Sequence, residues 1–215
     1  MTEVYIYVVA RDFGFAPNPF HGTCTLATCK PVIRRMAQEG DWVVGMGGKA
    51  LNAVGRCIYA MRVTDAISFD DYWAAPEFRS KRPARNGSRK TIVGDNIYHH
   101  IDGKTDWQQE DSHHSQPDGT PDLYNIQHDT QTDRVLISSH FYYFGKSAPL
   151  VPEAILEQIG FRNGMGHRVY KAREAQQLLS WMEGEFKNKV SHVLGDPFQF
   201  SRSNARYSKK KDRVI

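Results

Sequence analysis

Runs of apolar residues predict the β-strands of this chain. Residues 3–11 are apolar at nearly every position, which is typical of a core strand in a sheet covered on both sides. Residues 41–48 predict a strand that runs into a glycine-rich turn, and no phosphate-binding Gly-Lys-Ser/Thr sequence follows it. Side chains of different character alternate along residues 55–67 and 134–145, which is the period of a strand.

Apolar residues at helical spacing predict four helices between or after these strands. A short helix begins at Pro31, which suits a first turn, and ends at Gly40. A serine cap begins a second helix over residues 68–78, and residues 151–159 predict a third. The longest predicted helix covers residues 172–193 and has one apolar stripe that suits packing on a sheet.

The segment between the first strand and the first helix, residues 11–31, is predicted to be a long loop of defined shape. Pro17 and Pro19 restrict its backbone, while Gly14 and Gly22 can adopt positive φ angles. Its side chains include a carboxylate, an amide, an imidazole, two thiols and an ammonium group. A long irregular segment in a domain is usually a binding or active site. The alternative is an Ω-loop that closes the bottom of a barrel.

The charged residues are grouped in blocks. The chain of 215 residues has a net charge of +4. Residues 201–215 carry six basic residues and one acid, and residues 79–90 carry six basic residues and no acid. Residues 94–133 carry nine acids and one lysine. Charges grouped in blocks of one sign are typical of a protein that attracts charged ligands. Solvated loops that contain runs of like charge give the same pattern.

Composition and cysteine content predict a cytoplasmic protein with reduced thiols. No apolar run could span a bilayer, and the N-terminus lacks the pattern of a signal peptide. Cys24, Cys29 and Cys57 are an odd number of cysteines, and the first two are separated by four residues, unlike most zinc knuckles. Five of the nine histidines lie in residues 94–133, without the spacing of a helical zinc site. We therefore expect no metal and no cofactor, and a hydrated loop at 94–133 that folds over a barrel mouth.

The strand at residues 134–145 offers a possible stacking surface. One of its faces carries Ser138, His140, Tyr142 and Phe144. Aromatic rings next to hydroxyl or imidazole groups can hold a base by stacking and contact its edge. The alternative is an ordinary amphipathic barrel strand.

Several segments resemble a known family. They read VARDFGFAPNPF, CTLATCKPVIR, GDWVVG, GDNIY and FYYFG, and lie between about residues 5 and 152. They are similar to the second of the nucleotide modification associated domains, which occur in bacteria and phages and were proposed to act in DNA base modification. The order of short helix, Gly-Asp and apolar strand at residues 33–45 also resembles PUA-like domains, which include the ASCH, EVE and YTH domains.

The resemblance implies an α+β fold, a PUA-like mixed β-barrel with short peripheral helices, in a domain at residues 1–160. The apolar stripe and the basic run, which lie outside the resembling segments, predict a long C-terminal helix in a helical extension at residues 161–200 and a basic tail at 201–215. In PUA-like barrels that bind bases, the pocket lies beside the short helix after the first strand. Residues 18–34 would lie there.

Candidate site residues follow from this resemblance and from their chemistry. Asp12 is a candidate general acid or base, and Cys24 is a candidate nucleophile if His21 or Lys30 lowers its pKa. The candidate base-binding or nucleotide-binding residues are Arg11, Asn18, Phe20, Thr25, Lys30, Arg34, Trp42, Asp95, Asn96, Tyr98 and Phe144. Among them, Trp42, Tyr98 and Phe144 would stack on bases, and Lys30 and Arg34, with the basic segments, would hold phosphate.

Three functions remain open at this point. The first is a module of a bacterial or phage DNA-modification or defence system that binds DNA or a nucleotide and recognises a modified base. The second is an enzyme that modifies or hydrolyses a base or nucleotide in a pocket formed by Asp12, Asn18 and Lys30. The third is an interaction module for protein partners from the same operon. We expect no membrane partner.

Overall fold

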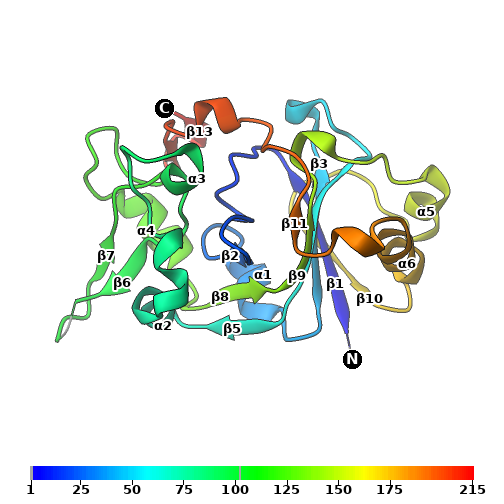
Figure 1. Ribbon diagram of the computed structural model, residues 1–215, viewed down its shortest axis with the longest axis horizontal. Helices are drawn as coiled ribbons and strands as arrows, with labels where there is room; N and C mark the ends of the chain where they lie inside the picture. The colour runs from blue at the N-terminus through cyan, green and yellow to red at the C-terminus, as the bar shows by residue number, and fades with distance from the viewer. Residues whose placement is uncertain (1, 102) are drawn as a thin grey trace.

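A six-stranded mixed sheet forms one half of the protein (Figure 1). The computed structural model describes residues 2–101 and 103–215. In spatial order the sheet contains β10 (His167–Lys171), β1 (Glu3–Val9), β3 (Trp42–Gly47), β4 (Cys57–Arg62), β9 (His140–Tyr143) and β11 (His192–Val193). β1 and β3 are parallel because helix α1 (Pro31–Met36) returns the chain between them. Of these strands, β1, β3, β4 and β9 lie within segments that the sequence predicts to be strands, as α1 lies within its predicted helix, whereas β10 and β11 were not predicted.

Smaller sheets form the other half. Three antiparallel strands lie in the order β2 (Cys24–Leu26), β8 (Val135–Ser138) and β5 (Asp65–Ile67). Two further sheets are two-stranded hairpins. One consists of β6 (Tyr98–His100) and β7 (Trp107–Gln109), and the other consists of β12 (Tyr207–Ser208) and β13 (Arg213–Val214). The described strands form no closed barrel, since β10 and β11 end the large sheet. The predicted α+β class is confirmed, whereas the barrel is not found.

Two predicted strands are each divided between two sheets. Residues 55–67 form β4 in the large sheet and β5 in the small one, and residues 134–145 form β8 and β9 in the same way. The chain bends at Thr64 and at Ser139, and the Ser139 N–H donates to the Thr64 hydroxyl at 3.0 Å. The alternating pattern continues through both bends, since β4, β8 and β9 are mostly buried and β5 still carries apolar Ala66 and Ile67, so periodicity did not show where the strands end.

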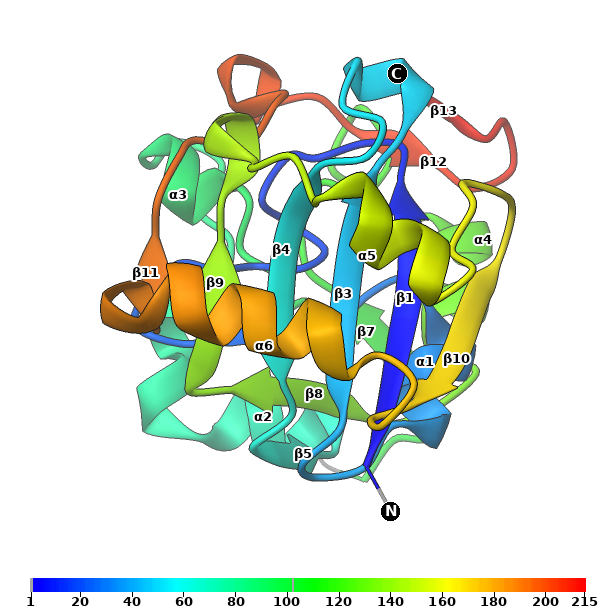
Figure 2. The ribbon, with the colours of Figure 1, turned by 90° about the vertical axis from the view of Figure 1, so that its right-hand side faces the viewer.

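The helices are short. Figure 2 shows α5 (Glu153–Gln158) and α6 (Gln176–Glu185) across one face of the large sheet. The other helices are α2 (Phe69–Ala74), α3 (Arg89–Ile92), α4 (Leu123–Asp129) and the 3₁₀ turns Lys49–Leu51, Pro76–Lys81, Gly145–Ser147, Lys187–Lys189 and Phe200–Arg202. Ser68 accepts a hydrogen bond from the Asp71 N–H at 3.0 Å, the cap that the sequence predicts. None of the helices in the described ranges could cross a bilayer, given their length and polarity.

The C-terminal part differs from its prediction. The long helix predicted over residues 172–193 is only the ten residues of α6, and the chain then turns to add β11 beside β9. β10 pairs with β1, so residues 161–200 supply both edge strands of the large sheet. The apolar stripe continued past α6 because Phe186 and Val190 also pack on the core. An apolar stripe therefore did not indicate where the helix ends.

A candidate active-site cavity beside helix α1

A cavity of about 490 Å³ opens at the carboxyl end of β1. Its wall is formed by residues 7–11 of β1 and the following loop, by residues 29–33 at the start of α1, and by residues 113–114. Residues of the C-terminal hairpin cover another side. This is the position beside the short helix where the resemblance implied a pocket. Its volume is in the range of small-molecule sites.

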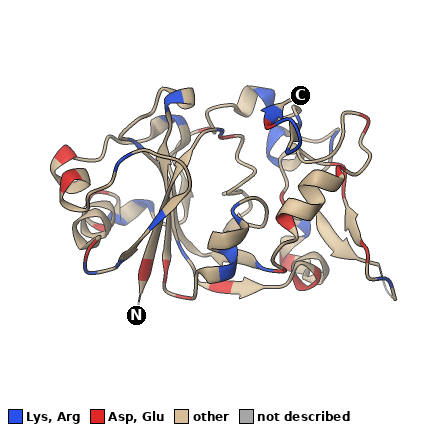
Figure 3. Cartoon of the chain, turned by 180° about the vertical axis from the view of Figure 1, so that it is seen from behind, with Lys and Arg blue, Asp and Glu red and all other residues tan. Residues whose placement is uncertain are grey.

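Aromatic rings and cations both line the cavity. Tyr7, Phe13 and Phe15 contribute apolar faces, and Arg11 and Lys30 contribute positive charge. The Lys30 ammonium lies 4.4 Å from the centre of the Tyr7 ring, and burial lowers the pKa of Lys30. Among the predicted binding residues, Arg11 and Lys30 line this cavity. Basic groups of the hairpin and of α1 can be followed in Figure 3.

Cys29, His114 and Asp129 form a hydrogen-bonded row at the cavity wall. The Cys29 sulfur lies 3.8 Å from Nε2 of His114. On the opposite side of the ring, Nδ1 of His114 donates to Oδ2 of Asp129 at 2.7 Å. Cys29 and His114 both line the cavity, whereas Asp129 is fully buried behind them. The row has the order of nucleophile, base and orienting carboxylate.

Charge within the row favours an ion pair. Burial disfavours the imidazolium form of His114, but Asp129 and Cys29 outweigh burial and raise the pKa of His114 to about 10. Burial also opposes ionisation of Asp129, yet His114 and Arg34 lower the pKa of Asp129 overall. At neutral pH an imidazolium therefore faces the Cys29 sulfur.

A surrounding shell fixes the backbone of this row. The Cys29 N–H donates to Oδ1 of Asp129 at 2.8 Å, and the Tyr98 hydroxyl donates to Oδ2 at 2.9 Å. Arg34, fully buried, donates from Nε to the Cys29 carbonyl at 2.9 Å and also binds the Asp129 carbonyl. Cys29 has a positive φ of 57°, a conformation that non-glycine residues rarely adopt. The shell therefore holds the thiol in a fixed position.

The same three residues are a possible metal site. Their ligand atoms lie within 4.8 Å of one another, the one such group among the residues that the structure describes. However, Oδ1 of Asp129 already accepts from the Cys29 N–H, and Oδ2 accepts from His114 and Tyr98. Only the sulfur and Nε2 of His114 remain, fewer than the three protein ligands of a typical catalytic zinc site. The geometry fits a nucleophile better than a metal.

Three predicted base contacts lie in a separate buried cluster. Asn18, Thr25 and Asp95 are completely buried, and the ammonium of Lys81 donates to Oδ1 of Asn18 at 3.0 Å. Thr25 and Tyr72 donate to Asp95 at 2.7 and 2.8 Å. Burial raises the pKa of Asp95 to about 6 and lowers that of Lys81. Because the cluster satisfies these side chains internally, the geometry does not support their contact with a base.

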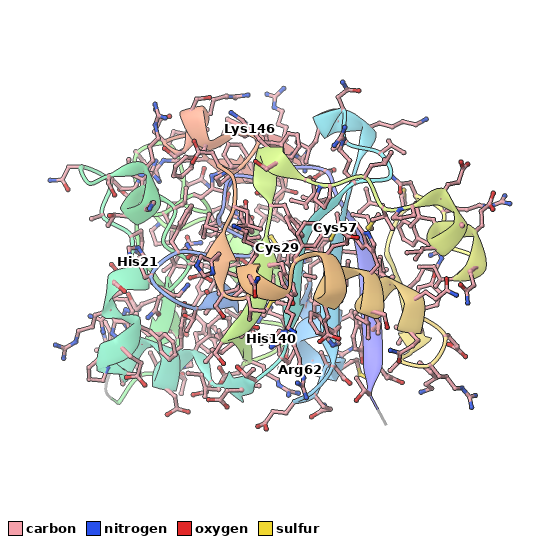
Figure 4. The ribbon with its side chains drawn as sticks, turned by 45° about the vertical axis from the view of Figure 1, so that its right-hand side comes forward. His21, Cys29, Cys57, Arg62, His140 and Lys146 are labelled. Carbon is pink, nitrogen blue, oxygen red and sulfur yellow. The ribbon has the colours of Figure 1, made fainter. Side chains whose placement is uncertain are left out.

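The two predicted catalytic residues do not line the cavity. Asp12 is buried and accepts hydrogen bonds from Tyr143 and from the Phe198 N–H. Cys24 is buried, and burial raises its pKa to about 12, which disfavours the thiolate. Figure 4 shows His21 at the outer side of the molecule and Cys29 in its middle. A catalytic role for Asp12 and Cys24 stays a prediction that this geometry does not support.

The remaining predicted residues belong to the core. Trp42 and Phe144 flank Tyr142 in a parallel stack, and Phe186 packs against the stack. This covers the face of β9 that was predicted to stack on bases, so the face is not available to a ligand. Phe20 stacks on Phe200, Asn96 donates to the Tyr72 carbonyl, and Tyr98 and Arg34 hold the row described above. Of these residues, Tyr98 and Arg34 affect the cavity only through their hydrogen bonds to Asp129 and Cys29.

Sequence reasoning missed His114 and Asp129 and gave Cys29 no chemical role. The acidic segment, residues 94–133, was predicted to be a hydrated loop. It instead forms β6, β7 and α4, and His114 and Asp129 are buried in it. His114 is 85 residues from Cys29 along the chain, and Asp129 is 15 residues from His114. A cysteine at a helix start and a histidine in an acid-rich segment were the available signals, and neither indicates proximity without the fold.

Comparison with known proteins gives one family. The sequence model of the family described as Nucleotide modification associated domain 2 matches residues 1–204. The match includes β10, α6 and β11, which lie beyond the segments that carried the resemblance. Comparisons with curated proteins and with solved structures gave no match.

Proposed function

Because the chain belongs to the Nucleotide modification associated domain 2 family, we propose that its cavity binds a nucleotide or a single base of DNA. The family description indicates a part in nucleotide modification. The finer proposal is recognition of a base, modified or not, in a bacterial or phage DNA-modification or defence system.

The observation that carries this proposal is the lining of the cavity. Tyr7, Phe13 and Phe15 line a space of about 490 Å³, and aromatic rings hold bases by stacking, worth about 1–3 kcal/mol per base. Lys30 and Lys209 place cations at its wall. Rings and cations together suit a ligand with a flat base and a phosphate.

A relation to PUA-like domains belongs to the same proposal. The succession of β1, α1 and β3, with the cavity beside α1, supports it. The open sheet is a departure from the barrel of those domains.

Fluorescence anisotropy with labelled single-stranded and duplex oligonucleotides tests binding, with free nucleotides as competitors. Replacing Lys30 and Lys209 by glutamine should weaken binding about tenfold or more for each lost phosphate contact, because hydrogen bonds to charged groups contribute roughly 1.5–3 kcal/mol. The slope of log affinity against log salt should fall by about 0.7 per lost contact on a single strand.

The matched control is the pair Lys187→Gln and Lys189→Gln, which removes the same charge from exposed residues of the turn after α6. The proposal requires a much smaller loss in this control. Equal losses in the two pairs would mean unspecific attraction to a basic surface, and the cavity would not be the binding site.

A further inference from the structure

A nucleotide-binding role does not need the row of Cys29, His114 and Asp129. A thiol that only packs is usually buried among apolar groups, as Cys57 is. The Cys29 sulfur instead faces the cavity and an imidazole whose other nitrogen is held by a buried carboxylate. This is the arrangement that activates a nucleophile for attack on a carbonyl carbon.

We propose that Cys29 and His114 are the catalytic residues of an acyl-group hydrolase, which acts on an ester or amide carbonyl carried by the ligand in the cavity. Asp129 is the positioning residue that fixes the orientation of His114. The inference rests on the proposed function, because the nucleotide or base is taken to carry the acyl group.

The reaction is balanced with water as the second reactant. The Cys29 sulfur bonds to the carbonyl carbon, the bond from that carbon to the leaving nitrogen or oxygen breaks, and Nε2 of His114 gives its proton to the leaving group. Water then bonds to the thioester carbon, the carbon–sulfur bond breaks, and the proton of the water returns to His114. The products are a carboxylic acid and the free leaving group, and no electron donor or acceptor is required.

The residue after the nucleophile offers a donor for the developing oxyanion. The backbone N–H of Lys30 has no hydrogen-bond acceptor in the described part of the chain, and Lys30 has a positive φ of 40°. In hydrolases with a nucleophile on a tight turn before a helix, the N–H of the following residue donates to the oxyanion. Lys30 occupies that place between Cys29 and Pro31, the first residue of α1.

The first test is covalent labelling of the wild-type protein with p-nitrophenyl acetate, followed by peptide mass spectrometry. We expect an acetyl group on Cys29 and none on Cys24 or Cys57, which are buried and serve as internal controls. The acetyl group should be lost again in water as the thioester hydrolyses. Labelling of Cys29 no faster than of a free thiol would overturn the proposal, as would a stoichiometric metal that blocks labelling until it is chelated.

His114→Asn tests the imidazole. Acylation of Cys29 should slow on the order of 10²-fold, the usual contribution of a positioned acid or base, and Asp129→Asn should slow it less. In both variants the dependence of the acylation rate on pH should change, because the charged imidazole beside the sulfur is lost or loses its carboxylate partner. A merely structural role would lower the rate equally at every pH and would contradict the assignment.

Other charged groups also act on this pH profile. The titratable and charged groups around the Cys29 sulfur are His114, Asp129, Lys30, Arg34, Tyr7, Tyr98 and Tyr207. Apart from His114 and Asp129, they are the same in the wild type and in both variants.

Acetylation and anisotropy, both measured on the wild type, separate this inference from the proposed function. Cys29→Ala should lose all acetylation at this position. Binding without acetylation of the wild type would leave the proposed function standing and refute the hydrolase. Acetylation at Cys29 without any nucleotide binding would refute the proposed function and leave an acyl hydrolase for another ligand.

Discussion

Three cysteines of one chain illustrate how surroundings decide the chemistry of a side chain. Cys24 and Cys57 are buried in the hydrophobic cluster around the large sheet, and burial raises the pKa of each to about 12. Cys29 lies at the cavity wall beside a charged imidazole. The same thiol is therefore a packing group in two places and a candidate nucleophile in the third.

His113 gives a prediction at this scale. Burial, His114 and nearby arginines lower its pKa to about 3, and its ring bonds the Ala205 carbonyl at 2.6 Å. A histidine in an unfolded chain has a pKa near 6.5. Below this pH, His113 therefore binds a proton in the unfolded chain but stays neutral in the folded protein. This contribution to stability is complete above about pH 6.5 and is lost as pH falls toward about 3, by roughly 1.4 kcal/mol per unit.

Urea unfolding of His113→Asn at several pH values checks this. The variant keeps an N–H donor for the carbonyl and should lose stability more slowly than the wild type between pH 6.5 and 4. His192→Asn, at an exposed position, is the control and should follow the wild type. Identical slopes for His113→Asn and wild type would contradict the assignment of acid sensitivity to His113.

At the scale of elements, the C-terminal hairpin has a structural role that its charge did not suggest. Residues 201–215 were expected to be a basic tail, but β12 and β13 pair with each other and pack on the acidic segment. The Tyr207 N–H donates to the His113 carbonyl at 2.7 Å, and Asn125 donates to the Tyr207 carbonyl at 2.7 Å. Arg206 forms an ion pair with Asp111. The hairpin therefore supports one wall of the cavity.

Truncation after residue 205 tests this support. It leaves the His113 carbonyl and the Asn125 amide without these partners, and each unpaired buried group costs about 1–3 kcal/mol. We expect a lower melting temperature and faster proteolysis within residues 110–130.

The matched control is the full-length triple variant Lys210→Gln, Lys211→Gln and Arg213→Gln. It removes charge from exposed positions and keeps the hairpin backbone. It should melt close to the wild type. Equal destabilisation of the two proteins would show that charge matters here and hairpin contacts do not.

For the whole molecule, strand β8 connects two hydrophobic clusters. Leu136 belongs to the cluster around the large sheet, while Val135 and Ile137 belong to the cluster around α2 and β6. Alternate side chains of one strand point to opposite faces, so β8 lies between the two cores. Neither core can lose this strand without affecting the other.

We therefore expect one cooperative unfolding transition. A variant that keeps only Trp42 reports by fluorescence on the cluster around the large sheet, and a variant that keeps only Trp107 reports on the cluster around α2 and β6. Their midpoints in urea should agree with each other and with circular dichroism. Leu136→Ala should lower both midpoints together, at a cost of about 2–5 kcal/mol. Separate midpoints for the two tryptophans would show that the clusters unfold independently.

Local pattern was enough to determine several parts of this protein. Apolar periodicity and caps located β1, α1, β3 and the start of α2, because these features depend on neighbours in the chain. Short motifs around residues 11–34 indicated the family and the region of the cavity. These signals lie within a few residues of one another and need no knowledge of the fold.

Only the tertiary structure decided the site. Asn18, Thr25 and Trp42 have side chains suited to binding, but packing buries them, and no sequence pattern distinguishes a buried amide from an exposed one. Cys29, His114 and Asp129 meet only because the acidic segment folds against the start of α1. Contacts between residues so far apart in the sequence depend on the path of the whole chain. That path places Cys29 at the cavity, and not Cys24 or Cys57.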